Sequence, residues 1–110
     1  MNEVDPQMLK GLVTLLLLHL VAEREDYGYA LVVRLRSAGF GDMTEGTVYP
    51  ALARLEHAKR LETSLVPSDK GPARKYYRIT AEGQAELERT RSAWSHLTGL
   101  VSGLVSKEKP

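Results

Sequence analysis

Cysteine is absent from the 110-residue sequence, which excludes a disulfide framework and thiolate chemistry and fits a reducing compartment. The sequence has no phosphate-binding glycine loop and no histidine–carboxylate arrangement, and no serine lies in the motif of a nucleophile. Its three histidines are far apart and lack the i, i+4 spacing of a metal site. We therefore expect no enzymatic activity, no catalytic residue, no cofactor and no metal centre.

Long apolar runs are also scarce. The longest, residues 12–22, is interrupted by Thr14 and His19 and is shorter than the roughly 20 residues that span a bilayer. The first residues, MNEVDPQ, are acidic and lack the features of a signal peptide. The sequence therefore predicts a cytoplasmic protein without a membrane partner, and its length is that of one domain.

The formal net charge is only +1, which argues against general affinity for nucleic acid. The charge is unevenly distributed, however. Residues 70–78 contain four cationic side chains and no acidic one, whereas residues 1–30 contain five acidic and two cationic side chains. The positive charge is thus local, as at the edge of a binding surface.

The stretch Thr44–Lys59 predicts a helix with two unlike faces. At 100° per residue one side is apolar and should face the core: Val48, Ala51, Leu52, Leu55 and Ala58. The other side lacks the glutamates and lysines of an ordinary outer face and consists of Gly46, Tyr49, Pro50, Ala53, Arg54 and His57. A face that is small, aromatic and partly cationic is suited to contact DNA.

Two helices are predicted before this one. Asp5 and Pro6 indicate the start of a first helix that runs to about Ala22 and is apolar on nearly all sides, so part of it should contact a second chain. Asp26 is expected to cap a second helix over residues 27–38.

That second helix should end at Gly39, in the left-handed conformation that glycine favours. Thr44 is expected to cap the next helix after a short connection, which gives a helix-turn-helix. Pro50 removes one backbone hydrogen bond, so this helix is expected to begin late or to bend.

The β-rich segments Leu61–Val66 and Arg74–Thr80 predict two strands joined by a loop, which would complete a winged helix. Tyr76 and Tyr77 fall on opposite strand faces, so one should enter the core and the other should shelter the preceding helix. Arg78 is expected to pair with a carboxylate.

Thr80 is expected to be the N-cap of a last helix. Apolar side chains recur along this helix every three or four residues: Leu87, Trp94, Leu97, Val101 and Leu104. Such a stripe is typical of a dimerisation helix. The predicted fold is mainly α with a small β-hairpin, a winged helix-turn-helix with N-terminal and C-terminal dimerisation helices. Residues 1–80 would form the DNA-binding domain, and residues 81–110 the dimerisation helix and tail of one compact unit.

Three segments together resemble the PadR family of bacterial transcriptional regulators: DYGYALVVRL, GTVYPALARLE and GPARKYYRITAEG. The resemblance extends from about Met8 to Val105, and the short last helix is similar to the compact branch of that family. It implies a winged-helix repressor that is dimeric through its first and last helices and binds a palindromic operator on double-stranded DNA.

Trp94 extends this resemblance to the multidrug-sensing members of the compact branch. In those proteins a tryptophan at the corresponding place stacks against planar aromatic compounds in a pore between the subunits. The resemblance implies a ligand-binding set of Met8, Leu15, His19, Leu87, Trp94 and Thr98. The chain departs from the drug-binding members at His19 and Thr98, where a small amide or acid is expected.

The predicted DNA-binding residues on the central helix are Thr44, Gly46, Thr47, Tyr49, Pro50, Ala53 and Arg54, and those on the wing are Lys70, Arg74 and Lys75. The helix would read base edges in the major groove, and the wing cations would grip phosphates. Three alternatives stay open: Tyr49 packs under the wing, Trp94 is only a dimer contact, or the winged helix binds a partner protein.

Overall fold

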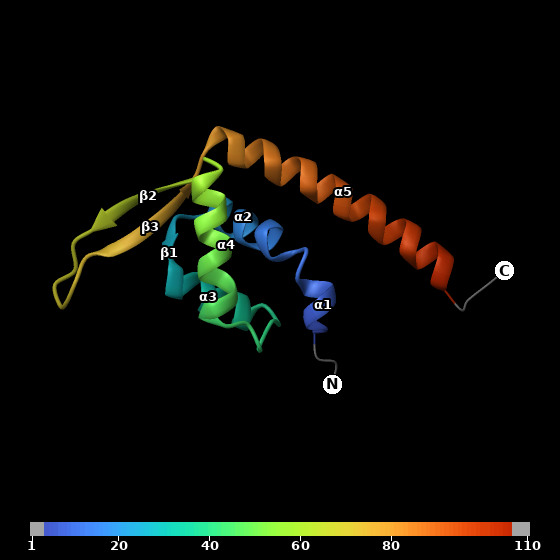
Figure 1. Cartoon of the computed structure of the whole chain (residues 1–110), viewed down its shortest axis with the longest axis horizontal. Coiled ribbons are helices and arrows are strands. Elements are labelled where there is room, and N and C mark those ends of the chain that lie inside the picture. Colours follow the sequence, from blue (N-terminus) through green and yellow to red (C-terminus); the bar gives the residue numbers. More distant parts are fainter. Residues whose placement is uncertain (1–3, 107–110) are drawn as a thin grey trace.

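The computed structural model describes residues 4–106, which form a small winged-helix body with one long helix extending from it (Figure 1). In chain order the elements are α1 (Pro6–Leu9), α2 (Val13–Glu23), β1 (Asp26–Tyr27), α3 (Gly28–Ser37), α4 (Glu45–His57), β2 (Leu61–Val66), β3 (Arg74–Ile79) and α5 (Ala81–Val105). This is the mainly helical winged helix-turn-helix that the sequence predicted.

The core lies where α2, α3 and α4 meet under the first turns of α5. Each of these helices contributes apolar side chains, and strand β2 adds Leu61. The largest fully buried side chains are Leu17, Leu18, Leu31, Leu35, Leu52, Leu61 and Leu87. Because burial of each such side chain contributes about 1.5–3 kcal/mol, this cluster fixes the orientation of α4 relative to the other helices.

The sheet is antiparallel and has the strand order β1-β3-β2. Strand β2 has the predicted bounds, and β3 ends one residue early because Thr80 acts as the N-cap of α5. Strand β1, whose two residues pair with Tyr76 and Tyr77, was not predicted from the sequence. This third strand ties the start of α3 to the wing.

The first helix is interrupted, contrary to the prediction of one continuous helix. Asp5 caps α1 as expected, by accepting hydrogen bonds from the backbone N–H groups of Gln7 and Met8. The helix then stops at Leu9, and α2 starts at Val13. Gly11 lies in the break, where its poor helix propensity favours a turn.

Asp26 does not cap α3, so that prediction was wrong. The N-cap of α3 is Tyr27, and Asp26 is a buried residue whose carboxylate accepts a hydrogen bond from Arg34 at 3.2 Å. A buried charge needs a partner, and Arg34 lies eight residues further along the chain. Gly39 has the predicted left-handed conformation, with φ of 116°.

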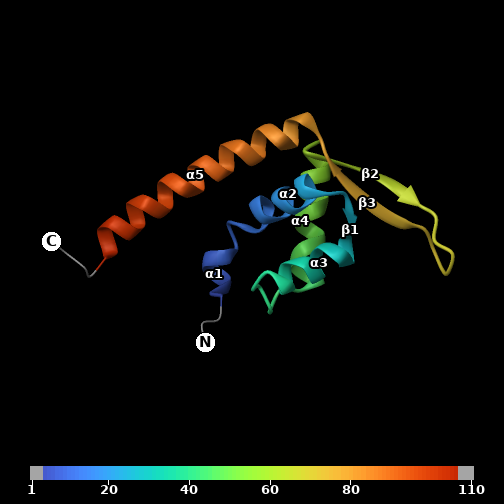
Figure 2. The same ribbon diagram turned by 180° about the vertical axis from the view of Figure 1, so that it is seen from behind.

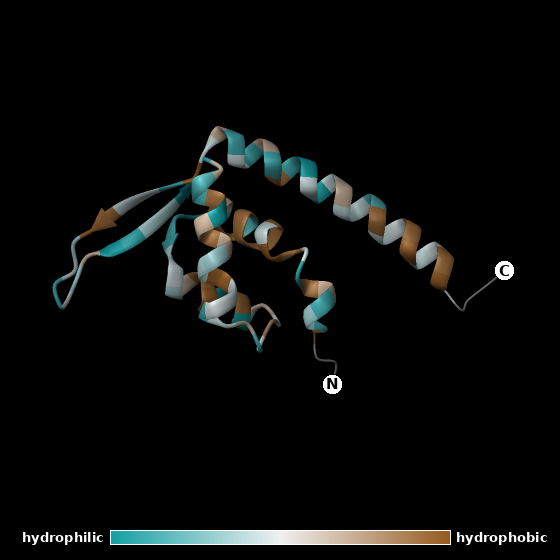
Figure 3. Ribbon diagram, in the orientation of Figure 1, coloured by the Kyte–Doolittle hydropathy of each residue, from teal (hydrophilic) through white to brown (hydrophobic). Residues whose placement is uncertain are grey.

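Helix α5 starts at the base of the wing and runs away from the hairpin, as both views show (Figures 1 and 2). Thr80 caps it by accepting a hydrogen bond from the N–H of Gly83 at 3.0 Å. Apolar residues recur along its distal half, which lies beyond the body (Figure 3). No helix among residues 4–106 is long and apolar enough to cross a membrane.

Candidate nucleic-acid interface

Helix α4 separates its side chains into a buried and an exposed face. Val48, Ala51, Leu52 and Leu55 are buried as predicted, whereas Ala58 lies past the last helical residue and is exposed. We define the recognition face as the seven predicted residues of this segment, all of which are exposed: Thr44, Gly46, Thr47, Tyr49, Pro50, Ala53 and Arg54. Only Arg54 among them is charged, so the rest of the face can approach a polar groove closely.

The N-terminus of α4 is capped as predicted. The hydroxyl oxygen of Thr44 accepts a hydrogen bond from the N–H of Thr47 at 3.3 Å, and the two hydroxyl groups are also 3.3 Å apart. The helix starts directly after this cap and continues through Pro50, so the expected late start is not observed. The positive end of the helix dipole at this position favours a nearby anion such as phosphate.

Tyr49 has 42% of its surface exposed and projects from α4 beside the start of α3 and the wing. Burial raises the pKa of its phenol, and the negative charge of Glu45 raises it further. The hydroxyl group therefore stays protonated at neutral pH and can donate a hydrogen bond to a base or a phosphate.

Lys75 is not a freely extended cation. Its ammonium group lies 3.0 Å from a carboxylate oxygen of Glu56, on α4, and 5.7 Å from the centre of the Tyr77 ring. The hydrogen bond between the two residues lowers the pKa of Glu56 and raises that of Lys75. Glu56 is not among the predicted site residues, because its contact with Lys75 joins two segments that are distant along the chain.

Arg74 lies over the ring of Tyr27, with its guanidinium carbon 4.4 Å from the ring centre. Tyr27 also contacts Tyr76, at 5.4 Å between ring centres. These contacts hold Arg74 against β1 at the loop end of the hairpin, where it pairs with Val66 of β2. Lys70, the third predicted wing cation, has an exposed side chain in the loop between β2 and β3.

The two adjacent tyrosines of β3 differ as predicted, but their roles needed correction. Tyr77 is buried and faces both the core and Tyr49, so it is the residue beside the recognition face. Tyr76 instead packs on Tyr27, away from that face. Arg78 pairs with Glu62 on the neighbouring strand at 2.7 Å, as expected.

A hollow of about 430 Å³ lies between the recognition face and the wing. Its lining is aromatic and cationic and consists of Tyr27, Gly28, Tyr29, Tyr49, Arg74, Lys75 and Tyr77. Tyr27, Gly28 and Tyr29 belong to the segment DYGY, which is not among the predicted DNA-binding residues. Their place in the hollow depends on β1, which the sequence did not reveal.

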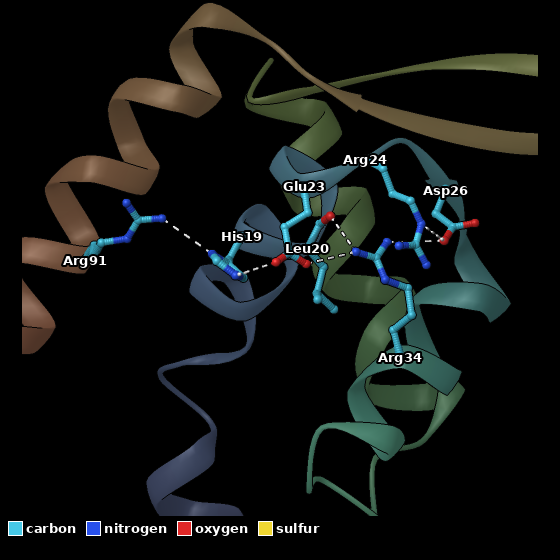
Figure 4. Close-up of polar contacts among 7 residues, drawn as sticks. All are labelled: His19, Leu20, Glu23, Arg24, Asp26, Arg34 and Arg91. Carbon is cyan, nitrogen blue, oxygen red and sulfur yellow. Dashed lines mark hydrogen bonds and ion pairs between the residues drawn. The ribbon is translucent and has the colours of Figure 1, made fainter.

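A polar network connects α5 with the helix-turn-helix (Figure 4). Arg34 donates hydrogen bonds to the carbonyl oxygen of Leu20 at 2.9 Å, to Asp26 and to Glu23. Glu23 also lies 3.3 Å from His19, whose other ring nitrogen is 3.4 Å from Arg91 on α5. The position of α5 is thereby linked to that of α3 through side chains on α2.

The structure brings only part of the predicted ligand-binding set together. Trp94 and Leu15 line one groove of about 200 Å³ between α2 and α5. Leu87 is 2% exposed in the single chain, where it packs in the core, and it does not line this groove. His19 instead contacts Glu23 and Arg91, and neither Met8 nor Thr98 lines that groove, although both are exposed.

The distal half of α5 presents an apolar stripe, which we define as Trp94, Leu97, Val101 and Leu104. Trp94 is 43% exposed and Leu104 is 82% exposed in the single chain. Among residues 4–106, no group of three or more histidine and carboxylate side chains is arranged to hold a metal ion.

This chain is similar to known transcriptional regulators in both sequence and fold. Residues 17–89 match the transcriptional regulator PadR-like family. The chain is 38% identical to a PadR-like transcriptional regulator of Bacillus cereus, with a TM-score of 0.82 and coverage of 93% of this chain and 99% of that one.

Two further crystal structures are similar. A Streptococcus transcriptional regulator is 36% identical, with a TM-score of 0.80 and coverage of 91% of this chain and 98% of that one. A PadR family regulator of Eggerthella lenta is 31% identical, with a TM-score of 0.84 and coverage of 93% and 88%. The similarity therefore covers the winged-helix body and most of α5.

Proposed function

Because this chain belongs to the PadR-like family of DNA-binding transcriptional regulators, we propose that it acts as a homodimeric repressor of an inverted-repeat operator. The observation that supports this most directly is the recognition face, seven exposed residues with a single charge beside a cationic wing. Transcriptional regulators of this family are generally not enzymes.

In this proposal α4 enters the major groove, where Tyr49 donates to base or phosphate oxygens and Ala53 contacts a thymine methyl group. Thr44 and Thr47 bind the adjacent backbone at the helix N-terminus. Lys70 and Arg74 bind flanking phosphates, and Lys75 joins them only when its contact with Glu56 is exchanged for DNA.

We assign DNA binding to residues 1–80 and dimerisation to residues 81–110. The N-terminal helical region, which belongs to residues 1–80, also contributes to the dimer contact. The apolar stripe of α5 supports this division, since its four side chains remain at least 43% exposed in the single chain. A two-fold symmetric dimer would read two half-sites about one helical turn of DNA apart.

We further propose that a planar aromatic ligand regulates this dimer by stacking on Trp94. Its support is the half-exposed indole at the mouth of a groove that Leu15 also lines. A ligand can change operator affinity only if it binds the two forms of the dimer with different affinities. Titration with a panel of planar dyes, followed through the fluorescence of Trp94, tests this part, and absence of saturable quenching would contradict it.

The decisive experiment for DNA binding is selection of bound sequences from a random duplex pool. The proposal predicts enrichment of an inverted repeat with a constant half-site spacing. Enrichment of a single unrepeated site would contradict the symmetric dimer, and no enrichment at all would favour the alternative of a protein-binding winged helix.

A further inference from the structure

Gly28, the first residue of α3, lies directly against the ring of Tyr49. A Cβ atom built on Gly28 would lie 2.6 Å from Cε1 of Tyr49 and 3.4 Å from both Cδ1 and Cζ. A carbon–carbon contact of 2.6 Å is far inside the usual 3.5–4.0 Å separation. The ring therefore occupies the space that any other residue at position 28 would fill with its side chain.

The backbone on both sides of this contact is held in place. Strand β1 pairs Asp26 with Tyr77 and Tyr27 with Tyr76, and Asp26 is also bound by Arg34. These contacts fix the start of α3 immediately before Gly28. The backbone of this segment therefore cannot move away from the ring without breaking a strand pairing or a buried ion pair.

Helix α4 is equally constrained around Tyr49. The flanking residue Val48 and, one turn on, Leu52 are fully buried, and Thr44 caps the helix start. The tyrosine side chain is the only part of this contact that can rotate, because its exposed side faces the hollow beside the wing. A side chain at position 28 would thus turn the ring while the fold persists.

We propose that Gly28 is a specificity-determining position, because its missing side chain sets the direction in which Tyr49 projects from the recognition face. Gly28 is a positioning residue in this role and need not touch DNA itself. This inference rests on the proposed function, in which Tyr49 contributes to sequence readout. It explains why a glycine, an unfavourable helix former, begins α3.

Gly28 differs from the other glycines near the interface, because a side chain at those positions would not meet the ring of Tyr49. Gly41, in the turn between α3 and α4, has nothing within 4 Å of a built Cβ. On the recognition face, Gly46 has only the hydroxyl of Thr44 nearby, at 3.7 Å. Gly83 contacts the backbone carbonyl of Arg60, so its role is in packing α5.

The test uses Gly28→Ala, Tyr49→Ala, the double variant and Gly41→Ala, which adds the same methyl group in open space. Dissociation constants are measured for the operator selected by the wild-type protein and for a random duplex. We expect the ratio of the two constants to fall on the order of tenfold in Gly28→Ala and in Tyr49→Ala, the size of one good base contact. Gly41→Ala should keep the wild-type ratio.

The double variant distinguishes positioning from a separate contribution. If Gly28 acts through the ring, adding Gly28→Ala to Tyr49→Ala causes no further loss of the ratio. A multiplied loss in the double variant, or an unchanged ratio in Gly28→Ala beside a reduced one in Tyr49→Ala, would overturn the inference. Failure of the wild-type protein to select any operator would overturn the proposed function as well, and is recognised before any variant is made.

A second measurement does not depend on DNA. The ring signals of Tyr49 in an aromatic NMR spectrum, assigned by their loss in Tyr49→Ala, should shift in Gly28→Ala and stay in place in Gly41→Ala. If Gly28→Ala folds poorly, Tyr49→Ala should restore its melting temperature, because the clash requires the ring. Unmoved signals, or no restoration in a poorly folding variant, would overturn the inference.

Discussion

Helices α4 and α5 begin in the same way and then differ in what they leave exposed. Each is capped by a threonine hydroxyl that accepts a backbone N–H three residues ahead. The apolar face of α4 is buried by the rest of the chain, and its recognition face has small and aromatic side chains with a single charge. Helix α5 buries Gly83 and Leu87 and leaves its later apolar residues exposed.

The difference indicates two kinds of partner. A small face with few charges beside cationic side chains fits a polar and negatively charged groove, where close approach matters more than apolar area. An exposed apolar stripe fits another apolar surface, because its removal from water is the main gain. The core of the winged-helix body is buried without the distal half of α5. The apolar stripe, in contrast, stays exposed to water in the single chain.

The first prediction concerns the covered face of α4 and has the largest expected effect. Leu52→Ala should lower the free energy of unfolding by about 2–5 kcal/mol, because it leaves a cavity in the core. Chemical denaturation measures this. Leu65→Ala, at an exposed position of the wing strand β2, is the matched control and should change stability by less than about 0.5 kcal/mol. Equal losses would show that α4 is not the better-packed element.

The second prediction concerns the stripe of α5. Leu97→Glu places a charge in the proposed dimer contact from each subunit and should raise the dimer dissociation constant about 100-fold or more. Sedimentation velocity over a range of protein concentrations measures the change. Ser92→Glu, on the other side of the same helix, should leave the dimer intact. A wild-type protein that sediments as a monomer would refute the assignment.

The third prediction concerns the charges beside α4. Glu56→Gln removes the carboxylate that competes with DNA for Lys75, so DNA binding should tighten while the salt slope stays near that of the wild-type protein. Lys70→Ala removes one phosphate contact and should flatten the slope by about 0.9 in logarithmic units. Both slopes come from mobility-shift titrations at several salt concentrations. An unchanged affinity in Glu56→Gln would mean that Lys75 does not reach a phosphate.

The smallest expected effect is the pH dependence of the pair between Glu56 and Lys75. The pKa of Glu56 is lowered in the folded chain, so the pair stabilises the fold above the ordinary pKa of a glutamate. This contribution is lost as the pH falls through the lowered pKa. Since both side chains are partly exposed, it should amount to less than about 0.5 kcal/mol.

Thermal unfolding of the wild-type protein and of Lys75→Met between pH 7 and pH 3 measures this contribution. The two curves should converge at the acid end of the range. A difference in melting temperature that grows on acidification would contradict the sign of the lowered pKa.

Most of the fold could be predicted because its signals are local. The caps Asp5, Thr44 and Thr80, the end at Gly39 and the strand β2 depend on residues a few positions apart. The misses depend on contacts between distant segments. No local signal shows that Asp26 pairs with Arg34, that Lys75 pairs with Glu56, or that β1 exists.

The candidate site was predicted in the same uneven way. All seven residues of the recognition face are exposed, because helical periodicity determines the side on which each lies. The apolar residues of α5 have one period along its whole length, whereas the body buries Leu87 and leaves the later ones exposed. Periodicity identifies a face and does not tell which chain covers it.

The length of α5 has a mechanical consequence. Its 25 residues, at about 1.5 Å each, form a rod of about 37 Å, with Trp94 near the middle and the wing joined to its first turn. About 20 Å separate the indole from that joint, so a tilt of about 5° at Trp94 would displace the joint by nearly 2 Å. Helix α5 would thus act as a lever arm, turning a small rotation near the tryptophan into a change in the distance between two wings.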